Sequence, residues 1–253
     1  MGMRFSCVGC GKCCNDHHVP LTLAEAVQWA DDGGQLIVLT EGFLEDAWLD
    51  LDPALQHARR RSLRVPSGSV HAYVAITFAA FNQGACRNLD ENKMCRIYER
   101  RPLVCRIYPM EINPHIPLRA ENKDCPPQAW EQGPRLIHGG QAVDADLRQL
   151  IERSRQADRD DIAAKAAICH LLGIRSMALK GEGFAAFMPD MTHFRQAAER
   201  VEALRLARFA HEQAWSLLAP SEDLIARLEE TGALIAAALE QHNLTYIPLR
   251  QAA

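Results

Sequence analysis

The chain has 253 residues, of which 48% are hydrophobic and 24% charged, with a net charge of −4 and a pI near 6.2. This is the balance of an ordinary globular protein that is long enough to bury a core. It does not indicate nucleic acid or an anionic membrane as a partner. We therefore expect a globular protein whose partner, if it has one, is another protein, for example a redox partner.

The cysteine content predicts the compartment. No run of residues reaches the roughly 18 consecutive apolar residues that a membrane helix needs. The cysteines begin at Cys7, where a secretory signal would otherwise lie. Nine cysteines in such a chain are expected to be reduced thiols in a cytoplasmic protein, because disulfides are rare in that compartment. Clustered thiols there indicate metal ligands or redox catalysts.

The first half of the chain combines loop signals with short elements. Thr22-Leu23-Ala24-Glu25 reads as a capping box and predicts a helix that stops at Gly33-Gly34. A second helix is expected over residues 52–61. Residues 70–81 are rich in β-branched and aromatic side chains, which predicts a strand. Residues 95–101 are expected to form a short helix or turn.

The second half is rich in Ala, Leu, Glu, Arg and Gln, which favour helices. We expect three of them, over residues 145–172, 191–218 and 221–242. The predicted fold class is therefore mainly α, with a small irregular α+β cysteine-rich part. Residues 1–133 would form a cysteine-cluster metal-binding domain, and residues 134–253 a helical domain or extension.

The opening cysteines have metal-ligand spacing. Cys7, Cys10 and Cys13 form a C-x2-C-x2-C run, and Cys14 follows directly. One tight turn can present two thiolates at this spacing, and interleaved glycines let the backbone fold round an ion. Adjacent side chains diverge, so Cys13 and Cys14 are more easily accommodated by two centres than by one. Four further cysteines then complete eight thiolates, enough for two four-coordinate sites: Cys86, Cys95, Cys105 and Cys125.

Both iron–sulfur and zinc fit these ligands. Iron–sulfur proteins use C-x2-C-x2-C with a remote Cys-Pro, and Cys125-Pro126 supplies the last part. Zinc needs only four thiolates at variable separation, but the later cysteines lack the tight pairs of zinc ribbons. The favoured hypothesis is iron–sulfur, with a first cysteine set of Cys7, Cys10, Cys13 and Cys125. A second cysteine set would contain Cys14, Cys86, Cys95 and Cys105.

Several neighbours could support such sites. Arg101 and Arg106 stand beside thiolates and would offset their charge, while Tyr98 and Tyr108 could donate hydrogen bonds to sulfur. Packing around a tight loop explains these four residues equally well. His17-His18 could replace a thiolate or lie at the surface. Cys169, inside a helical pattern, is expected to be a buried apolar side chain.

The cysteine motifs resemble those of the YkgJ-type cysteine-cluster family, a domain described as zinc- or iron-chelating. The resemblance covers about residues 4–127 and implies metal chelation on the eight cysteines. It rests on the following residues: Phe5, the Cys7–Cys14 run with Gly11, Leu21-Thr22, Cys86, Leu89, Cys95, Ile97-Tyr98, Arg101-Pro102, Cys105-Arg106, Tyr108-Pro109.

The sequence leaves the activity open, and catalytic residues cannot be named from it. P-loop, GxGxxG, GxSxG and HExxH motifs are absent. A site closed by four cysteines also offers no open position for catalysis. Three hypotheses follow. They are an iron–sulfur protein with an electron-transfer or redox-enzyme role, a zinc-stabilised interaction module without catalysis, and a metal storage or delivery protein.

Overall fold

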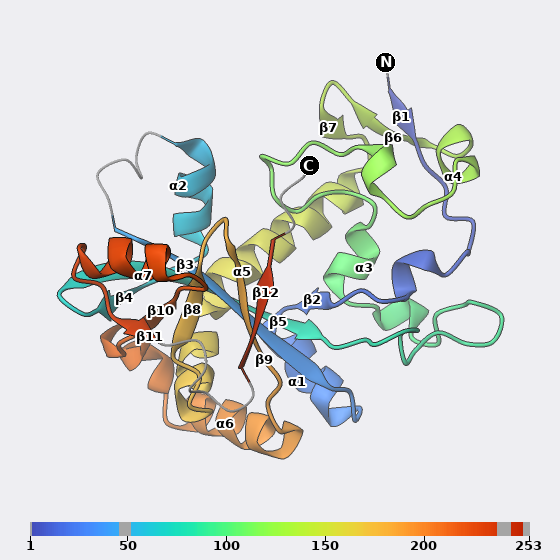
Figure 1. Cartoon of the computed structure of the whole chain (residues 1–253). Helices are drawn as coiled ribbons and strands as arrows, with labels where there is room; N and C mark the ends of the chain where they lie inside the picture. Colours follow the sequence, from blue (N-terminus) through green and yellow to red (C-terminus); the bar gives the residue numbers. More distant parts are fainter. Residues whose placement is uncertain (1, 46–51, 237–243, 250–253) are drawn as a thin grey trace. The chain divides into compact units, whose positions relative to one another are not determined.

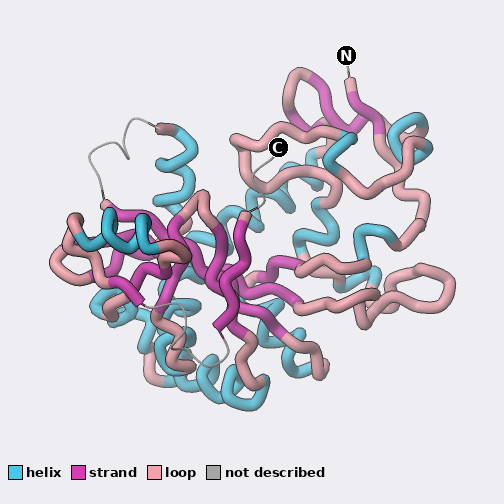
Figure 2. The backbone as a smooth tube through the Cα atoms, in the orientation of Figure 1, coloured by secondary structure: helices cyan, strands magenta, loops and turns pink. Residues whose placement is uncertain are grey.

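The computed structural model describes residues 2–45, 52–236 and 244–249 (Figure 1). The chain forms two compact units, each built from two separate stretches of sequence. The cysteine unit comprises Met1–Thr22 and Phe81–Ala157, and the sheet unit comprises Leu23–Ala80 and Asp158–Ala253. The strands of the sheet unit form a continuous group in Figure 2. The long helix α5 (Ala145–Leu171) begins in the cysteine unit and ends in the sheet unit.

The sheet unit is built on the antiparallel pair β3 (Leu36–Leu44) and β5 (Val70–Ala80). Their pairing runs from Leu36 opposite Ala80 to Leu44 opposite Ala72. Most residues of both strands are buried, so they read as nearly continuous apolar runs instead of alternating ones. The other strands are β4 (Leu63–Ser67) beside β5, β9 (Gly183–Phe187) beside β3, β12 (Leu244–Pro248) beside β9, β8 (Ser176–Leu179) parallel to β3, β10 (Ser216–Leu218) parallel to β8, and β11 (Ile235–Ala236) parallel to β10.

Helices pack against this sheet. Helix α1 (Leu23–Asp31) contacts β3, β5 and helix α6 (Met191–Ala203). Helix α2 (Pro53–Arg60) buries Ala58 against Phe43 and Tyr73. The unit also contains the 3-10 helix η5 (Leu206–Glu212), which contacts β4 and α6, and helix α7 (Glu222–Glu229), which contacts β11.

The cysteine unit has little regular structure and a small core. Leu103, Ile107 and Ile151 are its buried cluster, which joins α3 (Leu103–Ile107) to the first part of α5. Its other elements are β1 (Met3–Arg4), β6 (Arg135–His138) and β7 (Gln141–Ala142) in one sheet, strand β2 (Val19–Leu21), helix α4 (Gln128–Glu131), and the 3-10 helices η1 (Lys12–Cys14), η3 (Tyr98–Arg100) and η4 (Ala120–Asn122).

The predicted fold class, mainly α with a helical C-terminal half, is wrong. The protein is α+β, with a mixed sheet and a second, three-stranded sheet. Of the helices expected over 191–218 and 221–242, only the first parts form, as α6 and α7. The chain then turns into β10 and β11, and residues 237–243 lie outside the described residues. Alanine and leucine favour helices, but burial between strands outweighs that preference.

Other local predictions are confirmed. Helices α1, α2 and α5 and strand β5 lie where the capping, composition and β-branched signals predicted them. The short helix or turn expected over residues 95–101 is η3. Among the described residues, no helix is both long enough and apolar enough to cross a membrane.

Candidate metal centres

The first four cysteines lie on a tight N-terminal turn. Gly9 (φ +63°) and Gly11 (φ +72°) adopt the left-handed conformation that favours glycine. The carbonyl oxygen of Gly11 accepts from the backbone N–H of Cys14 at 3.0 Å and from the side-chain amide of Asn15 at 2.7 Å. A Cβ on Gly11 would lie 3.3 Å from the Cβ of Lys93, so the turn is also closely covered there. The turn therefore holds Cys7, Cys10, Cys13 and Cys14 on one compact loop.

A short backbone ladder joins this turn to the segment that carries Cys86. The backbone N–H of Cys86 donates to the carbonyl of Cys14 at 2.6 Å. The backbone N–H of Asp16 donates to the Gly84 carbonyl at 2.8 Å, and the Asp16 carboxylate accepts from the Gly84 N–H at 2.8 Å. An antiparallel bridge between Asn15 and Ala85 lies between these bonds. Cys14 and Cys86 are thus fixed side by side through their backbones.

Local structure determines the positions of Cys95 and Cys105. Cys95 forms an antiparallel bridge with Leu89. The loop between Leu89 and Cys95 is closed by the Asp90 carboxylate, which accepts from the backbone N–H groups of Asn92 at 2.9 Å and Met94 at 2.7 Å. Cys105 lies in the middle of α3, whose buried residues pack on α5. The small core of the unit therefore supports the position of Cys105.

Contacts of Cys125 itself and of the two residues before it hold this loop in place. The hydroxyl of Tyr108 lies 3.3 Å from the Cys125 sulfur. The ring nitrogen Nε2 of His17 lies 2.7 Å from the carboxylate of Asp124, which precedes Cys125. Lys123, just before Asp124, forms an ion pair with Glu111 at 2.6 Å. These contacts bring the Cys125 loop towards the N-terminal turn.

Electrostatic coupling joins the four thiols of the second cysteine set. The pKa of Cys105 is raised to about 12, chiefly by burial and in smaller part by the charges of Cys14, Cys86 and Cys95. Burial also raises the pKa of Cys86, with added contributions from Cys14 and Cys95. Cys14 and Cys95 therefore lie close enough to Cys86 and Cys105 for their charges to disfavour further negative charge there.

A similar pattern joins the first cysteine set. The pKa of Cys125 is raised mainly by burial and further by the charges of Cys10 and Cys7. The pKa of Cys13 is raised first by its hydrogen bond with Cys14, then by burial, and further by the charges of Cys125 and Cys7 as well as Cys14. Cys7 is exposed, whereas the other seven clustered cysteines are partly buried.

The two sets meet at Cys13 and Cys14, whose sulfurs lie 4.0 Å apart. The pKa of Cys14 is lowered, first by the hydrogen bond from Cys13 and also by the positive charges of Arg101 and His17. Within the described residues, no three His, Cys, Asp or Glu side chains converge closely enough to hold one ion. Coordination of one ion by four of these thiols therefore requires the cysteine side chains to move from the positions that the structure gives them.

The two tyrosines and two arginines expected to support the sites differ in their exposure and in the groups that they contact. Tyr108 contacts Cys125, and its own pKa is raised by burial first and then by that hydrogen bond. The charge of Arg101 lowers the pKa of both Cys14 and Cys105. Tyr98 is 53% exposed, and its ring centroid lies 3.8 Å from the guanidinium carbon of Arg101. Arg106 is exposed on α3.

The histidines and Cys169 also take definite positions. His17 is exposed and faces Asp124, a partner that sequence reasoning missed because 106 residues separate the two in the chain. His18 is half-buried and stacks on Phe81, with 5.0 Å between ring centroids. Cys169 is fully buried on α5, which confirms that it is an apolar core side chain.

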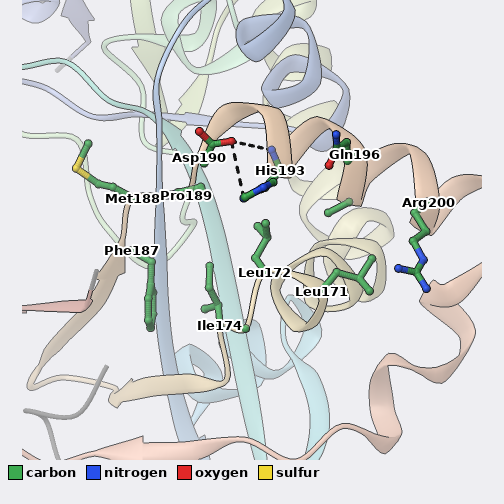
Figure 3. Close-up of a pocket in the computed structure, with 12 residues that line it drawn as sticks. Leu171, Leu172, Ile174, Phe187, Met188, Pro189, Asp190, His193, Gln196 and Arg200 are labelled. Carbon is green, nitrogen blue, oxygen red and sulfur yellow. Dashed lines mark hydrogen bonds and ion pairs between the residues drawn. The ribbon is translucent and has the colours of Figure 1, made fainter. Parts of the chain in front are cut away.

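A separate cavity of about 700 Å³ lies in the sheet unit (Figure 3). Its apolar wall includes Leu172, Ile174 and Phe187, and its polar edge is the first part of α6. Asp190 caps that helix by accepting from the backbone N–H of His193 at 2.9 Å, and its carboxylate lies 3.9 Å from the His193 ring nitrogen Nδ1. The described lining residues include no cysteine, so the cavity is distinct from the thiol sites.

The chemistry of the donor set fits a soft metal. Eight thiols lie in one unit, and their mutual repulsion is the kind that a bound cation relieves. All-sulfur ligation suits zinc or iron–sulfur centres. The site therefore defines a cysteine-rich metal-binding domain.

The comparison with protein families agrees. Residues 6–127 match the model of the CxxCxxCC family, whose description is "Putative zinc- or iron-chelating domain". This match over residues 6–127 agrees with the resemblance that the sequence motifs indicated. No curated protein and no solved structure was found to match the chain.

Proposed function

We propose that the protein carries two iron–sulfur centres, one on each cysteine set, and that it transfers electrons or supports a redox enzyme. The observation that supports two centres is the electrostatic grouping of the thiols. Cys125 couples to Cys10 and Cys7, and Cys105 couples to Cys14, Cys86 and Cys95, while Cys13 couples to Cys125 and Cys7 and, most strongly, to its neighbour Cys14. Adjacent Cys13 and Cys14 would then each serve a different centre.

The ligand spacing supports iron–sulfur for the first cysteine set. Its C-x2-C-x2-C run with a remote Cys-Pro has the outline of bacterial-type cluster sites. When bound, an iron–sulfur cluster supplies one-electron redox chemistry. A metal bound by four cysteines has no open coordination position for a substrate, which favours electron transfer over direct chemistry at the metal. Retention of reduced thiols would require a reducing compartment, so we place the protein in the cytoplasm.

The protein would tune the two centres by different means. The Tyr108 hydroxyl would donate to the Cys125 thiolate and withdraw charge from the first cysteine set. Arg101 would supply a positive charge to the second cysteine set, because it already lowers the pKa of Cys14 and Cys105. Different charge compensation is expected to give the centres different reduction potentials.

Zinc is the second candidate, because four thiolates also make a closed structural zinc site. The unit has a small core and little regular structure, and metal ligation commonly stabilises such units. In that case the domain would be an interaction module without catalysis. The exposure of Cys7 also allows exchange of metal with the surroundings, the property that a storage or delivery protein needs.

One experiment separates these functions. The full chain is purified without oxygen from iron-replete cells, and iron, sulfide and zinc are measured on the same sample with its visible spectrum. A brown protein with matched iron and sulfide supports the proposal. A colourless protein with two zinc ions per chain overturns it in favour of the structural module. Rapid transfer of the metal to a chelator would identify a storage or delivery protein.

A further inference from the structure

Two exposed apolar side chains belong to the N-terminal turn and to the loop beside it. Val8 is 50% exposed and Met94 is 52% exposed. They come from distant parts of the sequence, but a Cβ on Gly9 would lie 3.9 Å from the Met94 sulfur, so the turn and the Met94 loop are neighbours. The exposed thiol of Cys7 precedes Val8 directly. Together with the charges beside them, these two side chains offer a small apolar contact.

Basic residues accompany these two side chains. Lys12, Lys93 and Arg96 are all exposed, and the Cβ of Lys93 lies against Gly11 of the turn. The segment 86–106 contains six basic residues and three acidic ones, whereas the whole chain has a net charge of −4. One of those three acids, Asp90, is engaged with backbone N–H groups of its own loop. The cysteine-bearing segment 86–106 therefore has a formal charge of +3, opposite in sign to the charge of the whole chain.

We propose that Val8, Lys12, Lys93, Met94 and Arg96, here named the turn surface, form a docking site for an acidic electron-carrier protein. This inference rests on the proposed function, because it identifies the partner of the first centre. Complementary charges would steer the partner, and the small apolar contact at Val8 and Met94 would orient it. Cys7 lies at the rim of this surface, so docking there brings the partner close to the first cysteine set.

The composition of the turn surface predicts a weak and short-lived complex. Electron-transfer encounters bury little surface, and this one offers two exposed apolar side chains and three exposed basic side chains. Attraction between exposed charges is screened over about 8 Å at physiological ionic strength. Binding is therefore expected to weaken strongly as salt is added, as docking that depends on charge steering does.

The test uses an oxidised flavodoxin, an acidic electron carrier, as the probe. Its binding to the full-length protein is measured by NMR titration of labelled flavodoxin at low and at physiological salt. The double variant Lys93→Glu/Arg96→Glu should raise the Kd at least tenfold. The control Arg153→Glu/Arg205→Glu makes the same charge change at two exposed arginines and should change the Kd less than threefold. Equal losses in both double variants would show only a general charge effect and would overturn the docking site.

A separate variant tests the contribution of the apolar side chains of the turn surface. Met94→Ser leaves the charge unchanged and should raise the Kd severalfold, whereas Leu204→Ser, at another exposed apolar residue, should leave it unchanged. Absence of binding by the wild type at low salt would overturn the proposal. Metal and sulfide analysis of the same samples keeps the two proposals apart. Iron–sulfur without flavodoxin binding rejects the docking site alone, and zinc with salt-sensitive binding rejects the electron-transfer role.

Discussion

The backbone N–H of Cys86 donates to the carbonyl oxygen of Cys14 at 2.6 Å, which ties the second cysteine segment to the end of the N-terminal turn. Cys14 is thereby fixed towards Cys86, whereas its neighbour Cys13, which couples first to Cys14, also couples to Cys125 and Cys7. In the proposed arrangement, one cysteine set ends at Cys13 and the other begins at Cys14. Several expected outcomes depend on this division.

The first prediction concerns the adjacent pair. Cys13→Ser should remove one ligand from the first cysteine set and leave the second intact, and Cys14→Ser should do the reverse. Each variant should therefore retain about half of the wild-type metal, while the double variant loses nearly all of it. Metal analysis after anaerobic purification checks this, with Cys169→Ala as the control because Cys169 is buried in the sheet unit. Equal, complete loss in both single variants would contradict two separate centres.

Tyr108 gives the second prediction. Tyr108→Phe removes the hydroxyl that lies 3.3 Å from the Cys125 sulfur but keeps the ring. The metal of the first cysteine set should be held roughly 10- to 100-fold less tightly, as is usual when a hydrogen bond to a ligand is lost. Competition with a chelator measures this affinity. Tyr98→Phe is the matched control, because Tyr98 is exposed and stacks on Arg101. A similar loss in both variants would remove the special role of Tyr108.

The third prediction is that Arg101 acts on the second cysteine set. Arg101→Gln removes the positive charge that lowers the pKa of Cys14 and Cys105. With more negative charge to overcome, a redox centre on the second cysteine set should become harder to reduce, and its potential should shift downwards while that of the first set stays in place. Redox titration followed by EPR resolves the two centres. Arg106→Gln, at an exposed arginine of the same segment, provides the comparison; a shift of both centres would reject the assignment.

The sequence predicted the local features of the site well. C-x2-C-x2-C-C spacing and interleaved glycines predicted the tight N-terminal turn, because a tight turn leaves a short-range signal in the chain; that its cysteines bind metal stays a prediction. The contact of Tyr108 with Cys125 was also anticipated in kind, since a hydroxyl near a thiolate has an obvious use. The pairing of His17 with Asp124 was not predicted, because no local pattern indicates a contact across so many residues.

The sheet was the main error in the prediction of the fold. The apolar run in β3, Leu36–Leu44, is buried on both faces, so it lacks the alternation that marks a half-exposed strand. Strands β8 and β10 are only four and three residues long and lie between helical stretches rich in alanine and leucine. Their conformation is determined by partners such as Glu41 opposite Ala178, which come from distant parts of the chain. Local propensity cannot reveal such partners.

Gly11 gives a prediction about the turn itself. Gly11→Ala places a Cβ at φ +72° and 3.3 Å from the Lys93 Cβ. The left-handed conformation costs a non-glycine residue about 1–2 kcal/mol, and the contact adds to it. The variant should bind metal less tightly and release it faster to a chelator. Gly139→Ala is the control, since Gly139 also has a positive φ (+59°) but no atom within 4 Å of its added Cβ. Equal metal release in the two variants would show that close packing at Gly11 is unimportant.

A last prediction concerns the sheet unit and pH. Arg64 donates to the Glu45 carboxylate through Nε at 2.9 Å and Nη2 at 2.7 Å, and the Tyr73 hydroxyl donates at 3.1 Å. Chiefly because of Arg64, the pKa of Glu45 falls from 4.5 to about 2. Since the folded pKa lies below the unfolded one, the stabilisation is fully present above pH 4.5 and is lost as pH falls towards 2.

The pair is exposed, so solvent screening should limit its contribution to roughly 0.5–1 kcal/mol. Glu45→Gln should therefore destabilise the protein by that amount at pH 6, and by progressively less as pH falls from 4.5 to below 2. Urea unfolding of both proteins at several pH values, followed by tryptophan fluorescence, measures the difference. Glu182→Gln, at an exposed glutamate without a comparable ion pair among the described residues, should show no such pH dependence. A constant difference between wild type and Glu45→Gln across this range would mean that packing, and not ionisation, accounts for the effect.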